Sequence, residues 1–285
     1  MYGAIMGDIV GSKYEFSPIR SKDFPFVSQG CEFTDDTVMT IAVARALQKA
    51  QEKGNAGEQA SFKTILVEKM QELGHRFPNE SYGNRFMGWL NTSDPQPYNS
   101  FGNGSAMRVS PCGLFAVTLE EALELAKASA EVTHNHPEGV RGAQAVAACI
   151  FLAKTGASKE EIRAYVEENF YSSLKPVDDI SIGYAFDETC QGSVPQSISC
   201  FLDANSYEDA VRNAVLLGGD ADTMAAIAGS IAWRYYQPCE DIVERYHINE
   251  MLPEDFVETI EEFGKQCALR ADEYAQTGNC ASIPL

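Results

Sequence analysis

The chain has 285 residues, which is enough for one large domain or two small ones and for a sizeable hydrophobic core. Hydrophobic residues make up 45% of the chain and charged residues 22%, and these proportions exclude an intrinsically disordered or collagen-like protein. Lysine and arginine total 22 against 41 acidic residues, so the net charge of −19 favours solubility and makes a nucleic-acid backbone an unfavourable partner.

The chain opens with MYGAIMGDIVGSKYEF, which lacks the basic start of a signal peptide and whose apolar residues are interrupted by Asp8. It contains no run of roughly 18 apolar residues that would span a membrane. The eight cysteines are scattered, with no CxxC pair that would indicate a zinc or thioredoxin-like site. We therefore expect a soluble, reduced, cytoplasmic protein with no membrane partner.

Helical patterns dominate the rest of the chain. Apolar residues recur at helical spacing over 37–50, where Gly54 is expected to end the helix, and again over 58–73. In a capping box, a Ser or Thr side chain and a Glu three residues later satisfy the free backbone groups of a helix start. This motif opens two further predicted helices, at Thr118–Glu121 and at Ser158–Glu161.

Other helices are expected from Pro137 to just before Gly156, and at about 206–217, 221–236 and 253–275. The period-2 alternation of strands is almost absent. Residues 76–113, and less strongly 171–200, are rich in loop-forming residues, and connections of that length usually serve a site. Because there is no internal repeat or composition break, the sequence predicts a single all-α, compact multi-helix domain over residues 1–285.

Two pairs of carboxylates directly precede strong helices, in Thr34-Asp35-Asp36-Thr37 and in Gly219-Asp220-Ala221-Asp222-Thr223. Taken alone, each cluster is explained by helix capping, because Asp and Thr are favoured caps and acid there complements the helix dipole. A second adjacent acid adds repulsion unless a cation neutralises it. If the clusters meet in space, their roughly six oxygen ligands suit Mg²⁺ or Mn²⁺, and a pair of ions could hold a phosphorylated or hydroxyl-rich substrate.

The segment Ser100 to Arg108 is a glycine-bearing loop that runs into a predicted helix. Backbone N–H groups at such a junction bind phosphate, although Gly-Asn-Gly is equally compatible with a simple turn. His134 and His136 are spaced as a possible metal-binding pair. Without a cysteine or third histidine nearby, a structurally satisfied histidine or a ligand contact is the favoured interpretation.

Five segments, in this order, resemble the motifs of the ADP-ribosylglycohydrolase family, whose members include dinitrogenase-reductase-activating glycohydrolases: GDIVGSKYE (7–15), FTDDT (33–37), SFGNGSAMRVSP (100–111), THNHPEGVRGA (133–143) and GGDADTMAAIAGSIAW (218–233). The resemblance extends from residue 3 to about 236. It implies an all-α fold with two Mg²⁺ (or Mn²⁺) ions at its centre. It also implies a hydrolase that releases ADP-ribose from a modified side chain, with an O-linked serine-type or an N-linked arginine linkage.

The resemblance also implies roles for individual residues. The metal ligands would be Thr34, Asp35, Asp36, Asp220, Asp222 and Thr223. Glu15 matches a glutamate on a mobile loop near the metals, and either Glu15 or Asp36 would transfer the proton. The substrate-binding residues would be Ser100, Phe101, Gly102, Asn103, Gly104 and Ser105, which cradle the diphosphate with Phe101 against the adenine, and His134, near the phosphates or the distal ribose.

Two other functions stay open at this point. A dimetal phosphohydrolase could use the same carboxylates to cut a nucleotide diphosphate, with AMP and ribose phosphate as products. A family member that binds ADP-ribose without turnover is the second alternative, and the presence of all six candidate metal ligands argues against it. Within the family reading, Glu15 in GSKYE favours the O-linked branch.

Overall fold

The computed structural model describes residues 1–55, 61–239 and 241–278, and in these ranges the secondary structure is helical, with no strands. The helices are α1 (Tyr2–Ser12), α2 (Asp35–Asn55), α3 (Phe62–Arg76), α4 (Asn84–Leu90), α5 (Gly104–Met107), α6 (Ser110–Phe115), α7 (Leu119–Glu131), α8 (Pro137–Lys154), α9 (Lys159–Asn169), α10 (Val177–Ser181), α11 (Cys190–Leu202), α12 (Tyr207–Leu217), α13 (Ala221–Tyr236), α14 (Asp241–Arg245), the 3₁₀ helix η1 (Ile248–Met251) and α15 (Glu254–Thr277). The all-α prediction is confirmed.

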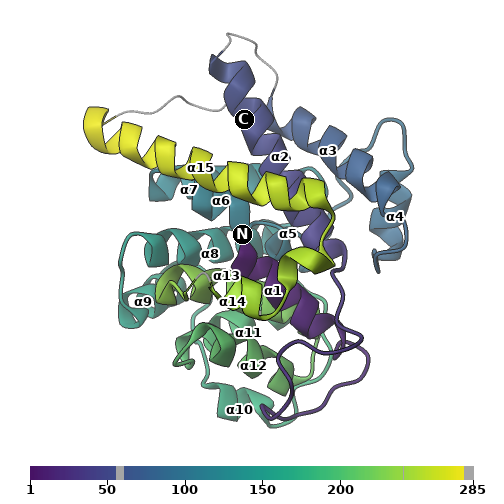
Figure 1. The fold of residues 1–285 in the computed structure, drawn as a ribbon, viewed down its shortest axis with the longest axis vertical. Coiled ribbons are helices and arrows are strands. Elements are labelled where there is room, and N and C mark those ends of the chain that lie inside the picture. Colours follow the sequence, from purple (N-terminus) through teal and green to yellow (C-terminus); the bar gives the residue numbers. More distant parts are fainter. Residues whose placement is uncertain (56–60, 240, 279–285) are drawn as a thin grey trace.

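Helix α1 packs along α13 at the centre of the molecule (Figure 1). The contact is backbone against backbone, because glycines recur at every fourth residue of α1. A Cβ atom added to Gly3, Gly7 or Gly11 would lie 2.2–2.5 Å from a carbonyl oxygen of α13. Interaxial distance depends on the side chains at the contact, so only glycine permits this approach. The sequence analysis predicts no helix here, because glycine has low helix propensity and the packing that compensates for it is tertiary.

The other predicted helices are present, with small differences at their ends. Helix α2 begins at Asp35, two residues before the predicted start, and continues past Gly54. Residues 58–60 of the predicted second helix lie outside the described residues, and α3 begins at Phe62. The capping box at Ser158 is complete, whereas the Glu121 side chain accepts from Val117 N rather than from the capping residue itself.

The predicted long loops contain helices of their own. Residues 76–113 hold α4, α5 and α6, and α4 forms because it buries Phe86, Trp89 and Leu90. Residues 171–200 hold α10 and most of α11, which begins after its capping residue Thr189 and contains Pro195. Short, Gly-, Ser- and Pro-bearing helices have weak local signals, so burial rather than propensity decides their structure.

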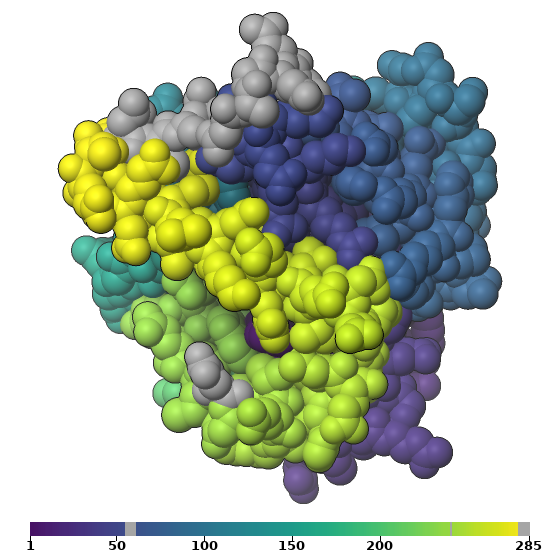
Figure 2. Space-filling view, turned by 45° about the horizontal axis from the view of Figure 1, so that its top comes forward, coloured from purple at the N-terminus to yellow at the C-terminus, as the bar shows by residue number. Residues whose placement is uncertain are grey.

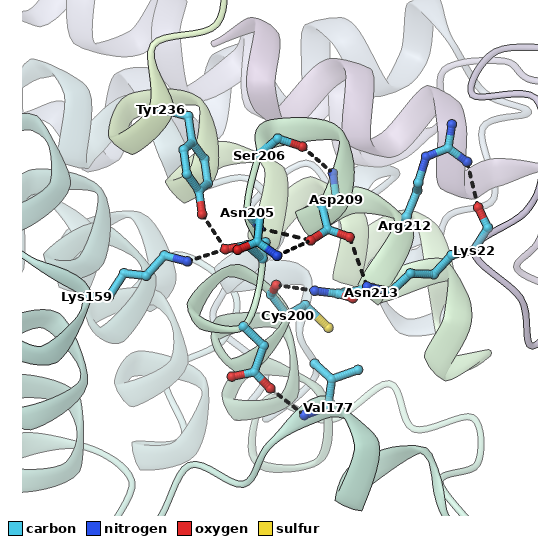
Figure 3. A network of polar contacts seen from close by, with 12 residues as sticks. Lys22, Lys159, Val177, Cys200, Asn205, Ser206, Asp209, Arg212, Asn213 and Tyr236 are labelled. Carbon is cyan, nitrogen blue, oxygen red and sulfur yellow. Dashed lines mark hydrogen bonds and ion pairs between the residues drawn. The ribbon is translucent and has the colours of Figure 1, made fainter.

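The connection between α1 and α2, which carries Glu15, is fixed to α12 by polar contacts (Figure 3). Lys22 Nζ donates to Asp209 Oδ1 of α12 at 2.9 Å. Arg212 Nη1 of the same helix donates to the backbone oxygens of Lys22 and Phe24 at 2.8 and 2.7 Å. Asp209 and Arg212 both lie on α12, so this helix holds the connection in place although the connection contains no helix of its own.

Helix α15 lies across the outside of the molecule over α2 (Figures 1 and 2). Asp255 in its first turn accepts from Arg45 of α2 at 2.7 Å and from both terminal nitrogens of Arg76 of α3 at 2.5 and 2.8 Å. Three helices are therefore tied together at one carboxylate. None of the helices in the described ranges combines the length and hydropathy that crossing a membrane requires.

Candidate active site

The two acidic clusters at the starts of α2 and α13 meet in the structure. Thr223 Oγ1 donates to Asp36 Oδ2 at 3.2 Å, which joins the two helix starts directly. Carboxylate oxygens of Asp8, Asp36 and Asp222 lie within 4.8 Å of one another, and so do those of Glu15, Asp220 and Asp222. The sequence spacing left open whether the two clusters meet, and in the structure they do. Asp222 belongs to both groups.

Asp8 is a residue of this site that the sequence analysis does not assign. It is fully buried on α1, and its Oδ1 accepts from Thr34 Oγ1 at 2.8 Å. Its Oδ2 accepts from Thr34 N at 2.9 Å and from the N and Oγ1 of Thr37 at 3.1 and 2.5 Å. Asp8 therefore holds the start of α2 in place. The available signal is an acid inside the apolar run GAIMGDIVG, because a buried carboxylate needs partners.

The carboxylates of this cluster repel one another, and a bound cation would relieve that repulsion. Burial, followed by repulsion from Asp222, raises the pKa of Asp35, Asp36 and Asp220 well above the usual range. The same two causes raise the pKa of Asp8 to about 7 and that of Glu15 to about 8. No ion pair between described residues includes any of these acids.

Two oxygens of the cluster have no hydrogen-bond partner although they are buried. They are Asp36 Oδ1 and Asp222 Oδ1. An unpartnered buried carboxylate oxygen is costly, and the cost falls when a cation binds it. Carboxylate and hydroxyl oxygens are the ligands that Mg²⁺ and Mn²⁺ prefer, so the residues present fit a hard divalent cation.

The acids line a cavity of about 470 Å³ together with the glycine loop and His134. This volume falls in the usual range of small-molecule sites, roughly 300–1,000 Å³. Of the candidate metal ligands, Asp35, Asp36, Asp220, Asp222 and Thr223 line the cavity, as does Glu15. Thr34 does not, because its buried hydroxyl donates to Asp8.

Within the glycine loop, residues 100–104 line the cavity whereas Ser105 does not. The Ser105 hydroxyl is buried and donates to Gly139 O at 2.8 Å, so it fixes the loop to α8. Asn103 Nδ2 donates to Asp220 Oδ2 at 2.7 Å, which links the loop to the acidic cluster. A Cβ atom on Gly104 would lie only 3.2 Å from His134 Nε2. Glycine at this position therefore allows the loop backbone to approach the His134 ring closely.

The two histidines have separate roles. His136 is the capping residue of α8: its Nδ1 accepts from Glu138 N at 3.1 Å, and its ring meets the half-exposed ring of Phe101 edge-on. His134 is buried, faces the cavity and shares a hydrogen bond of 2.7 Å with Thr133 Oγ1. Burial, aided by Arg108, lowers the pKa of His134 well below its usual value, so the ring is neutral. The two do not form a metal-binding pair.

The model of the family described as ADP-ribosylglycohydrolase matches residues 1–236. The chain belongs to the ADP-ribosylglycohydrolase family. The family resemblance inferred from the five sequence motifs is confirmed, and the chain is a hydrolase of this family. The matched segment runs from α1 to the last residue of α13 and contains every site residue described above, whereas α14, η1 and α15 lie beyond it.

The relatives of this chain carry different activity names. The chain is 28% identical over 269 residues to ADP-ribosylarginine hydrolase Tri1 of Pseudomonas putida (strain GB-1), which covers 83% of this chain and 69% of the relative. It is 26% identical over 310 residues to ADP-ribosylhydrolase ARH3 of Mus musculus, with 82% of each covered. A solved structure titled ADP-ribosylglycohydrolase-related protein complex superposes with a TM-score of 0.65 at 23% identity, covering 92% of this chain and 95% of that one, and it supports the fold.

Proposed function

We propose that this chain hydrolyses the glycosidic bond between ADP-ribose and a modified side chain, with two divalent ions bound between α2 and α13. The observation that carries the proposal is the pair of carboxylate groups that share Asp222 beside a ligand-sized cavity. We further propose that residues 1–285 form one domain of this family, because the buried apolar residues form one core cluster. The described cysteines carry no disulfide, which is consistent with a reducing, cytoplasmic location.

We assign the metal ligands from the carboxylate oxygens that have no hydrogen-bond partner. Asp36 and Asp222 would hold one ion, because each has a buried oxygen without a partner. Asp220 and Glu15 would complete the second group with Asp222, and Asp35 and Thr223 line the same cavity. Asp8 already accepts four hydrogen bonds, so we assign it and Thr34 to positioning the start of α2. Mg²⁺ or Mn²⁺ bound there supplies polarisation of the ribose hydroxyls and neutralises the buried acids.

The remaining steps belong to side chains of this protein. The backbone of the glycine loop and the neutral His134 ring would bind the diphosphate and its adjoining ribose. The exposed ring of Phe101 is free to stack on the adenine. Glu15 is only partly buried and lies on a connection rather than in a helix, so it can reach the reacting atoms. We assign the proton transfer to Glu15, because Asp36 is buried and committed to Thr223.

The linkage is proposed as O-linked serine-type or N-linked arginine. One relative is named for ADP-ribosylarginine, whereas the other carries the broader name ADP-ribosylhydrolase. The acceptor would be a modified protein or small molecule that presents an ADP-ribose group.

Product analysis tests the proposal. Arginine- and serine-linked ADP-ribosyl peptides are incubated with the protein and Mg²⁺, and the products are identified by mass spectrometry. Intact ADP-ribose from either linkage supports the proposal. AMP together with a phosphoribosyl peptide would overturn it in favour of a phosphohydrolase, and binding of ADP-ribose without release from either peptide would indicate a non-catalytic member.

A further inference from the structure

Exposed apolar side chains gather beside the candidate active site. Six large apolar residues are exposed within the described residues, and four of them lie on two segments, Phe16 with Ile19 and Ile182 with Phe186. The first segment follows Glu15 directly, and the second precedes Glu188. Glu15, Phe186 and Glu188 all line the cavity. Exposed apolar groups next to a binding cavity mark a surface that a ligand or partner covers.

The two segments are far apart in sequence but joined in space. The rings of Phe16 and Phe186 are nearly parallel, at an interplanar angle of 24° and a centroid distance of 6.5 Å. Phe16 is 76% exposed and Phe186 47%, so most of this aromatic pair faces water. Aromatic pairs gain most when they are desolvated, and here a ligand rather than the protein core would supply that cover.

Arg20 holds the two segments in this arrangement. Its Nη2 donates to Tyr184 O at 2.6 Å, and its Nη1 donates to Leu217 O at the end of α12. The backbone of Arg20 has a φ of +50°, a left-handed conformation that costs free energy in a non-glycine residue. The aromatic pair is therefore preorganised, and a ligand that packs against it does not have to order the two loops first.

The position of the pair relative to the acids indicates which part of a substrate meets it. Phe16 and Glu188 flank Glu15, and Glu15 belongs to the carboxylate group with Asp220 and Asp222. The ring of Phe101 packs edge-on against His136, and the backbone of its loop pairs with the segment that carries Glu188: Asn103 N donates to Glu188 O at 2.8 Å and Cys190 N to Phe101 O at 2.9 Å. Because we assign the proton transfer to Glu15, the acceptor of a bound substrate would leave the ribose beside Glu15, and therefore next to Phe16 and its partner ring Phe186.

We propose that Phe16 and Phe186 form an acceptor-side subsite that selects ADP-ribosylated chains with an apolar residue next to the modified side chain. The inference rests on the proposed function. The neighbouring carboxylate of Glu188 repels acidic residues at the same position, so the subsite favours apolar over acidic flanks. The two phenylalanines are specificity-determining residues and take no part in the chemistry.

Three ADP-ribosyl peptides of identical linkage test the inference, with leucine, glycine or aspartate on both sides of the modified residue. The expected order of kcat/KM is leucine, then glycine, then aspartate, with a leucine-to-glycine ratio of about 5 to 10, the size of one aromatic contact. Phe16→Ser and Phe186→Ser should each bring this ratio toward 1. Phe186→Tyr should restore it, because the ring is kept.

Leu269→Ser is the matched control, because Leu269 is also a large exposed apolar residue but lies on α15, outside the residues that line the cavity. It should leave the leucine-to-glycine ratio unchanged. A wild-type ratio of 1, or variants that keep the wild-type ratio, would overturn the inference and leave the proposed function intact. Release of ADP-ribose from none of the peptides would instead overturn the proposed function, and this inference with it.

Discussion

Asp222 is the carboxylate that both acidic groups share, and it has a buried oxygen without a partner. We predict that Asp222→Asn lowers kcat/KM by about a thousandfold or more, the cost of removing a group that acts on the transition state. In chelator the variant should unfold at the same or a higher temperature than the wild type, because the substitution removes one of several crowded buried charges. Peptide hydrolysis and thermal unfolding measure the two effects.

The surface variant Asp179→Asn is the control for this test, since Asp179 is exposed on α10 and outside the cavity. It should retain wild-type activity. A strongly destabilised Asp222→Asn variant would show that Asp222 has a purely structural role, and the assignment of the metal site would then be wrong.

Glu15 is the residue to which we assign proton transfer. Glu15→Gln keeps the size of the side chain and removes its ability to ionise. We predict that turnover falls by about a hundredfold or more, the usual contribution of a general acid or base, while the affinity for ADP-ribose changes by less than about threefold. Single-turnover rates and calorimetry with ADP-ribose measure these quantities. Equal losses in both would make Glu15 a binding residue instead.

At this scale, sequence reasoning identifies the acids but not their partners. Asp35, Asp36, Asp220 and Asp222 stand out as pairs before helices, and the family motif adds Glu15. Asp8 has no such pattern, because its four hydrogen-bond donors come from residues 26 or more positions away. The commitment of the Ser105 hydroxyl to Gly139 O is likewise a tertiary contact that local pattern does not reveal.

At the level of elements, the close contact of α1 with α13 sets the geometry of the site, since it brings Asp8 to Asp222. We predict that Gly7→Ala destabilises the protein by about 3 kcal/mol, the upper part of the range for overpacking, because the new Cβ would lie 2.2 Å from Ala225 O. Activity should fall as well, since the helices that carry Asp8 and Asp222 are forced apart. Urea unfolding and peptide hydrolysis test both effects.

Gly264→Ala is the matched control, because a Cβ atom there would meet nothing within 4 Å on α15. It should leave the protein as stable or up to about 1 kcal/mol more stable, as expected for alanine in place of glycine in a helix. If Gly7→Ala were equally harmless, the backbone contact between α1 and α13 would not exist in solution.

The elements differ in how well they can be predicted. Helices α7, α9 and α12 carry both an amphipathic pattern and a local capping residue, so sequence and structure agree on them. Helix α1 owes its formation to contact with α13, and α11 contains serines, a glycine and Pro195 that lower its local propensity. The sequence analysis misses both of these helices, because their formation depends on tertiary packing rather than on local propensity.

For the whole molecule, the attachment of α15 depends on ionisation. Hydrogen bonds from Arg76, aided by Arg45, hold the pKa of Asp255 well below its usual range. A lowered carboxyl pKa stabilises the fold above the unfolded-state value, about 4, and this contribution is lost as the pH falls. Asp255→Asn should cost about 1 kcal/mol at pH 7, because the carboxylate is one-third exposed, and less at pH 3.

Urea unfolding of wild type and variant at the two pH values measures this difference. Glu262→Gln serves as the control, since Glu262 forms only an exposed pair with Lys265 at 3.8 Å, and it should change stability by less than about 0.5 kcal/mol. A cost for Asp255→Asn that is the same at pH 3 and pH 7 would contradict the ionic role.

At the largest scale, the all-α class and the family could be predicted from the sequence. The spatial contact between residues 34–37 and residues 219–223 could not be derived from their spacing. About 180 residues separate the clusters, and only the packing of α1, α2 and α13 brings them together. The family motif supplies that information indirectly. Helix α15 lies outside the matched segment, so its position over α2 is known from the structure alone.

The most direct test of the account is the rate of ADP-ribose release from a cleavable peptide as a function of free Mg²⁺ or Mn²⁺, starting from protein treated with chelator. We predict no release in chelator and full recovery when either ion is added back, with no recovery for Asp222→Asn. Undiminished release in chelator would contradict the central claim that the paired carboxylates act by holding metal ions.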